Sequence, residues 1–318
     1  MVRMDVGFRH VVSLAVAIAF LVGGCAEGGD EPSRPDAGDT PGTSEGADEF
    51  ARSFEQIDIG SVSLHLECWG EPVAGEPTVL LISGLGPPAS SWDLMATEFA
   101  AEDHHLCAYD RAGVGGSDAA PEARRTTEDQ VADLVALLDA ADLQEPVVLV
   151  AHSFGSHPVV GLVDRAPERV VGVVLVDPTS PRVSAVQRAA LPPKKPDESP
   201  NVAEERRFLN DFLFDPAQNQ EHLLLAACEK EVGRLLDEPG PVFGDLPVVV
   251  LRAPPLPPLR GLPRSYEKAT RAAISEGHRE FAAESTRGTL IEVEDTGHNI
   301  HDDQPEVVMD AIHDVMAG

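Results

Sequence analysis

The segment Pro146–Gly155, which reads PVVLVAHSFG, constrains the fold of this chain more than any other stretch. Val147–Val150 is an unbroken apolar run, which predicts a strand buried on both faces of a sheet. A segment with helical composition follows Ser153. A strand, a small residue, a serine, a small residue and a helix, in that order, are typical of a nucleophile elbow. The small residues are Ala151 and Gly155, so we expect a tight turn that strains the serine backbone and presents its hydroxyl.

The chain begins with a predicted signal peptide, residues 1–24. The apolar run Val11–Val22 follows Arg3 and Arg9, and its length is typical of a signal-peptide core rather than of a membrane span. The run ends in Gly23, Gly24 and Cys25, which resembles a bacterial lipobox and implies cleavage before Cys25 and lipidation of that residue. The alternative is an ordinary secretory signal. We therefore expect a protein outside the cytoplasm, lipid-anchored to the bacterial cell envelope or otherwise secreted.

Residues 25–50 are predicted to form a disordered acidic tether, because Ala26–Glu49 holds no large apolar side chain and many carboxylates. The formal net charge of the chain is −30, which makes nucleic acid a poor partner and leaves the N-terminal lipid as the only expected membrane contact. Residues 51–318 fit one α/β domain, and the hydrophobic share of 42% is ample for its core.

Strand and helix patterns alternate along that domain, which predicts a mostly parallel sheet of eight strands with helices on both faces. An opening hairpin predicts an antiparallel edge. The pattern breaks at about Thr179–Asp245, which we expect to be a helical lid insertion. The expected strands are Phe54–Ile59, Val62–Glu67, Thr78–Ile82, His105–Tyr109, Val147–Val150, Val171–Val176, Leu246–Leu251 and Thr289–Val293; the expected helices are Ser90–Ala101, one begun by the capping-box pair Thr127 and Gln130, one from the elbow to about Arg165, Glu204–Phe212, Gln220–Leu236 and Gln304–Met316.

This order of motifs resembles the α/β-hydrolase fold, and the similarity covers roughly Phe54 to Gly318. Ser83–Gly86 stands where the family carries its oxyanion loop, Tyr109–Gly115 looks like the family's Asp-Arg-x-Gly-x-Gly turn, and Gly297–His301 looks like its catalytic histidine loop. The chain departs from the family in two places. Ser83 replaces the usual histidine, and no carboxylate follows the strand at Leu246–Leu251 where the family usually carries one.

The resemblance implies a catalytic triad. Ser153 is expected to be the nucleophile and His298 the base that takes its proton, with His301 as the nearest rival base. The triad acid is assigned to Asp177, which directly follows a buried strand, as in some family members. A structural role for Asp177 as a cap of the insertion is the alternative, and Asp295 and Asp302 are rival acids.

Backbone N–H groups of Leu85 and Phe154 are expected to form the oxyanion hole, as the family resemblance implies. The sheet order of the family also places the strand that ends near Glu67 beside the one that begins near Leu106. It therefore implies a disulfide between Cys68 and Cys107, in keeping with an oxidising compartment. Cys228 is expected to remain a buried free thiol.

The predicted function is a serine hydrolase that cleaves small carboxylic esters through an acyl-enzyme on Ser153. An amidase or aminopeptidase with the same triad is one alternative, and a non-catalytic binding protein on the same scaffold is the other. The sequence predicts no cofactor, and the histidines and cysteines show no paired spacing typical of metal ligands.

Overall fold

The computed structural model describes residues 51–120, 124–141, 143, 146–255, 257 and 260–318. The predicted signal peptide, the predicted lipidation site Cys25 and the predicted acidic tether therefore lie outside the described residues. Among the helices of the described ranges, none has the length and apolar character needed to cross a membrane.

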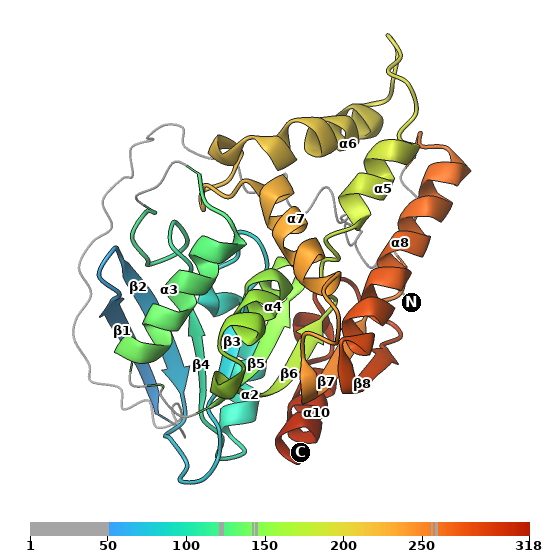
Figure 1. Ribbon diagram of the computed structural model, residues 1–318. Helices are drawn as coiled ribbons and strands as arrows, with labels where there is room; N and C mark the ends of the chain where they lie inside the picture. The colour runs from blue at the N-terminus through green and yellow to red at the C-terminus, as the bar shows by residue number, and fades with distance from the viewer. Residues whose placement is uncertain (1–50, 121–123, 142, 144–145, 256, 258–259) are drawn as a thin grey trace, which may run out of the picture.

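The sheet has eight strands in the order β1-β2-β4-β3-β5-β6-β7-β8, which confirms the predicted architecture (Figure 1). The first two strands form the predicted hairpin and pair antiparallel at one edge, whereas β3 to β8 run parallel. The strands are β1 Arg52–Asp58, β2 Ser63–Trp69, β3 Val79–Ile82, β4 Leu106–Tyr109, β5 Val147–His152, β6 Val170–Val176, β7 Gly244–Arg252 and β8 Ser285–Glu292.

Helices cover both faces of the sheet because successive side chains of the central strands point to opposite sides. On one face, Leu80, Leu149 and Val173 pack with residues of α3, α4 and α7. On the other face, Leu81, Val150 and Val174 pack with residues of α2 and α10. The helices in chain order are α2 Asp93–Ala100, α3 Thr127–Ala140, α4 Ser156–Arg165, α5 Val183–Ala190, α6 Pro200–Asn210, α7 Leu225–Leu236, α8 Arg264–Ala283, α9 Ile300–Asp303 and α10 Pro305–Met316.

The predicted insertion lies between β6 and β7 and contains α5, α6 and α7. In Figure 1, α6 runs across the top of the molecule above α5 and α7. The sequence patterns predicted α6, but they placed the start of α7 too early and missed α5 and the long helix α8. The capping box at the start of α3 is also one residue earlier than predicted. Thr126 and Asp129 form it, whereas the side chains of Thr127 and Gln130 are buried.

A disulfide joins Cys68 to Cys107, as predicted. The two residues face each other in the antiparallel register of β2 and β4, so the bond links the edge hairpin to the parallel part of the sheet. Cys228 of α7 is a buried free thiol, also as predicted, and burial raises its pKa to about 12. A thiol with so high a pKa carries almost no thiolate near neutral pH, which makes it unreactive.

Candidate active site

Ser153 lies in the sharp turn between β5 and α4, in the left-handed region with φ of 52°. The turn requires small neighbours, because a Cβ at Gly155 would stand 2.6 Å from the carbonyl oxygen of Ile82. The Ser153 hydroxyl is hydrogen-bonded to the hydroxyl of Thr179, at 3.1 Å. The strand, strained serine and helix thus have the geometry of the predicted elbow.

Asp177 follows the end of β6, and His298 lies in the loop before α9. The fold brings these two side chains together. His298 Nδ1 donates to Asp177 Oδ2 at 2.6 Å. Because an ionised carboxylate only accepts hydrogen bonds, this contact places the ring proton on Nδ1 and leaves Nε2 with a free lone pair. Asp177 Oδ1 accepts a second hydrogen bond, from the backbone N–H of Ala253. The carboxylate therefore binds the histidine loop and the segment after β7 rather than the start of the insertion.

The rival residues of the histidine loop occupy other positions. His301 is buried, its ring lies 4.3 Å from the ring of Trp92, and burial lowers its pKa to about 4. Its packing against a core tryptophan is that of a structural residue. The hydrogen bond of His298 goes to Asp177 rather than to Asp295 or Asp302.

His152, the residue before the serine, holds the histidine loop in place through a hydrogen bond. Its Nε2 donates to the backbone carbonyl of His298 at 3.1 Å. Burial, together with the nearby rings of His298 and His301, lowers the pKa of His152 well below its usual value. A neutral His152 therefore fixes the loop that carries His298 without adding a charge beside it.

The predicted oxyanion loop passes directly over the serine. A Cβ at Gly84 would lie 3.3 Å from Ser153 Cβ, so glycine permits the close approach. Leu85 and Phe154, whose N–H groups were predicted to form the oxyanion hole, line one cavity together with Ser153 and His298. Ser83, in place of the family's histidine, accepts a hydrogen bond from Trp92 and donates one to the Pro88 carbonyl.

A buried ion pair holds this loop in place. Arg111 donates to the backbone carbonyls of Ser83 and Gly84, each at 2.6 Å. Its guanidinium also makes a bidentate pair with Glu221 of the insertion, at 2.6 and 2.8 Å. Glu221 in turn accepts from the N–H of Gly86 at 3.1 Å. The insertion is thereby tied to the oxyanion loop through a guanidinium that contacts both.

The cavity above Ser153 has a volume of about 260 Å³ and opens between the sheet and the insertion. Much of its wall is apolar, contributed by Leu85, Phe154, Phe208, Leu213 and Leu225. Glu229 of α7 also lines it and is hydrogen-bonded to Ser184 of α5. Desolvation raises the pKa of Glu229 to about 7. The cavity thus combines an apolar wall with one weakly acidic group.

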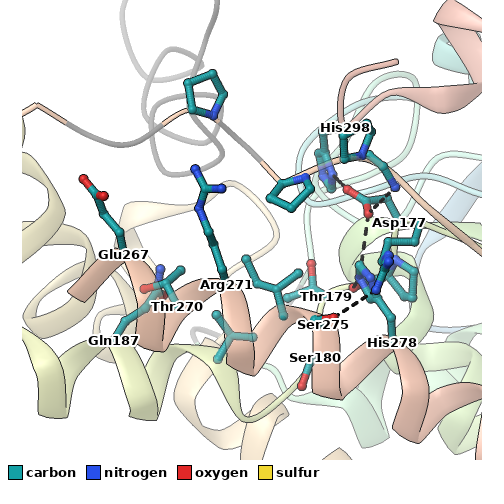
Figure 2. Close-up of a pocket in the computed structure, with 18 of the residues that line it drawn as sticks. Asp177, Thr179, Ser180, Gln187, Glu267, Thr270, Arg271, Ser275, His278 and His298 are labelled. Atoms are coloured by element: carbon teal, nitrogen blue, oxygen red, sulfur yellow. Dashed lines mark hydrogen bonds and ion pairs between the residues drawn. The ribbon is translucent and has the colours of Figure 1, made fainter. Parts of the chain in front are cut away.

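A second cavity, of about 180 Å³, lies on the other side of Asp177 and His298, against α8. Figure 2 shows Asp177 between the rings of His298 and His278. His278 Nε2 lies 3.7 Å from Asp177 Oδ1 and donates to the carbonyl of Pro178 at 3.1 Å. Burial lowers the pKa of His278, so the neutral ring fixes the backbone next to the carboxylate.

Several of these supporting residues were not found from the sequence. Thr179, His278 and Glu221 come from the insertion or from α8, where the strand and helix patterns were weak. The Asp110–Gly115 turn was recognised only through the family motif. Its Arg111 has a specific task in the structure, which is to hold two carbonyls of the oxyanion loop.

The elbow serine, the Asp177–His298 hydrogen bond and the parallel sheet define a protein of the α/β-hydrolase class. Residues 79–311 match the Alpha/beta hydrolase family, and the chain belongs to that family. It is 26% identical over 246 residues to the uncharacterized protein YqjL of Bacillus subtilis, covering 75% of this chain and 83% of YqjL. It is 38% identical to the "Putative carbamate hydrolase RutD" of Variovorax paradoxus, where the match covers 36% of this chain and 42% of the relative.

Among solved structures, the enol-lactonase from Burkholderia xenovorans LB400 has a TM-score of 0.56 and 19% identity to this chain. That match covers 84% of this chain and 100% of the lactonase. Identity at this level shows the shared fold.

Proposed function

We propose that the protein is a serine hydrolase that cleaves carboxylic esters through an acyl-enzyme on Ser153. The observation that carries the proposal is the 2.6 Å hydrogen bond between Asp177 and His298, because His298 lines the cavity that also contains the strained elbow serine. Membership of the hydrolase family supports it. The carboxylate holds the imidazole in the tautomer that can accept the serine proton.

In the proposed reaction, His298 Nε2 removes the proton of Ser153 as the hydroxyl attacks the ester carbonyl. The oxygen of the tetrahedral intermediate becomes negative and is stabilised by the N–H groups of Leu85 and Phe154. His298 then gives the proton to the leaving alcohol. Water, activated by the same histidine, releases the acid and restores Ser153.

The resting hydroxyl must change its partner for this reaction. Ser153 is hydrogen-bonded to Thr179, and no hydrogen bond joins it to His298 among the described residues. Catalytic hydrogen bonds are often long in ligand-free structures and tighten when substrate binds. We infer that the Ser153 hydroxyl exchanges Thr179 for His298 when an ester occupies the cavity.

The apolar wall of the cavity supports a substrate with an apolar acyl or alcohol part. The test is a screen of nitrophenyl esters of increasing acyl length, run beside nitroanilides with the same acyl groups. Ester turnover that Ser153→Ala abolishes supports the proposal. Faster turnover of the amides would instead identify an amidase, and no Ser153-dependent turnover of either series would favour a binding protein.

We also propose that the enzyme works outside the cytoplasm, anchored by a lipid on Cys25. The disulfide between Cys68 and Cys107 supports this location, because such bonds persist in oxidising compartments.

A further inference from the structure

A cluster of three side chains lies at the end of the sheet opposite to Ser153, where the parallel strands begin. His104 precedes β4, Glu102 follows α2, and His313 is in the last turn of α10. The active-site residues instead follow the carboxyl ends of the parallel strands. One possible ligand atom from each member of the cluster lies within 4.8 Å of the other two.

Two distances inside the cluster match those between the ligands of a tetrahedral ion. His104 Nε2 and His313 Nε2 are 3.3 Å apart, and His313 Nε2 lies 3.3 Å from Glu102 Oε2. Zinc binds nitrogen and oxygen at about 2.0–2.2 Å, so two of its ligands at the tetrahedral angle are about 3.3–3.6 Å apart. Both distances from His313 Nε2 therefore suit two ligands of one such ion, and the ligand atoms of Glu102 and His104 lie within 4.8 Å of each other.

His104 is already oriented as a metal ligand. Its Nδ1 lies 3.2 Å from Glu76 Oε2. A carboxylate on Nδ1 places the ring proton there and leaves the Nε2 lone pair aimed at the cluster, which is the usual outer-shell arrangement of a metal-binding histidine. The buried ring of Phe99 stacks on His104 at 4.5 Å and lies 5.0 Å from the ring of His313. The Phe99 ring thus packs against both imidazoles.

The same arrangement is a poor one for the side chains alone. With His104 protonated on Nδ1, one N–H on His313 must serve both the His104 nitrogen and the Glu102 carboxylate. A bound cation would instead accept a lone pair from each of the three side chains. The other histidine and cysteine cluster of the described residues, Cys68, His105 and Cys107, has no free thiolate, because its sulfurs form the disulfide.

We propose that Glu102, His104 and His313 bind a divalent transition-metal ion, for which Zn²⁺ has the matching geometry. Imidazole nitrogen with one carboxylate suits zinc and its neighbours rather than Mg²⁺ or Ca²⁺, which take oxygen ligands. The side chains of Glu102 and His313 are 46% and 40% exposed, so water reaches the fourth position. The bound ion joins the C-terminal helix to the turn between α2 and β4.

The site is independent of ester hydrolysis. A ligand that binds the folded chain and not the unfolded one raises the midpoint of thermal unfolding. Zn²⁺ is therefore expected to raise that midpoint and to leave the turnover rate unchanged at one ion per chain.

The test is a calorimetric titration of the untagged protein with ZnCl₂ after treatment with a chelator. The expected result is one ion per chain, with binding at least about tenfold weaker in His104→Ala and in His313→Ala. His65→Ala, which removes an imidazole from β2, is the matched control and keeps the wild-type affinity. Zn²⁺ should raise the unfolding midpoint of the wild type and of His65→Ala only.

Two results would overturn the proposal. The first is an absence of stoichiometric binding in the wild type. The second is binding that persists in the His104→Ala and His313→Ala double variant and is lost in His298→Ala, which would place the ion in the active-site histidine cluster instead.

Discussion

Removal of the Glu221 carboxylate is expected to damage both the fold and catalysis, because the pair with Arg111 is almost fully buried. The side chains of Arg111 and Glu221 are only 4% and 1% exposed. Glu221→Ala leaves the guanidinium charge buried without its partner, and breaking a buried pair in this way costs about 3–5 kcal/mol. The variant also removes the acceptor of the Gly86 N–H in the oxyanion loop.

The double variant Arg111→Met/Glu221→Leu separates these two effects. Replacement of a buried ion pair by apolar residues of similar size is often neutral or even stabilising, so the double variant should be more stable than Glu221→Ala. It still lacks the bonds from Arg111 to the carbonyls of Ser83 and Gly84. Loss of one oxyanion donor lowers kcat about 10²–10³-fold, and a displaced Leu85 N–H should have an effect of this size.

The assays are urea unfolding for stability and ester turnover for catalysis. Glu238→Ala is the control, because its pair with Arg234 at the end of α7 is exposed, and it should cost no more than about 0.5 kcal/mol. The reasoning is refuted if the double variant is no more stable than Glu221→Ala. It is also refuted if a folded double variant keeps wild-type kcat.

Three further predictions concern the triad, a buried acid and the N-terminus. Asp177→Asn should keep the unfolding midpoint and lower turnover of an ester by about 10³–10⁴-fold; near-normal turnover there, with loss in Asp295→Asn or Asp302→Asn, would move the acid to the histidine loop. Burial raises the folded-state pKa of Glu229 to about 7, whereas the ordinary pKa of the group is 4.5. Between these two pH values the folded chain holds a proton that the unfolded chain has lost, so stability should fall as pH rises. Glu229→Gln should flatten that part of the curve of unfolding midpoint against pH, and an unchanged slope would contradict the cause. Cys25→Ser should move the protein from the membrane fraction to the soluble fraction, and mass spectrometry of a wild-type N-terminus that begins elsewhere without lipid would contradict lipidation.

The strands themselves could be predicted because their sequences carry the physical signal directly. β5 and β6 are runs of valine and leucine with no polar interruption, which only a sheet covered on both faces can bury. The order of the strands in the sheet, and with it the pairing of Cys68 with Cys107, came instead from the resemblance to the family. The position of Ser153 followed from the small residues that flank it, since a Cβ at Gly155 would clash with the backbone of β3.

Helix α8 and the supporting contacts could not be predicted, because their signal is not local. Helix α8 is rich in charged residues and buries only a few of its side chains, among them Tyr266, His278 and Phe281, so no strong apolar stripe marks it. Glu221 meets Arg111 across 110 residues of sequence. The absence of paired ligand spacing likewise gave no sign of the proposed metal site, whose two histidines are 209 residues apart.

The most direct test of the proposed function is labelling of the folded protein with a fluorophosphonate, which reacts with activated serines whatever the substrate. We expect one label per chain, recovered by peptide mapping on Ser153. Labelling should be absent in Ser153→Ala and strongly reduced in His298→Ala, which lacks the base. A wild-type protein that takes no label, or a Ser153→Ala variant that labels as well as the wild type, would contradict Ser153 as the nucleophile.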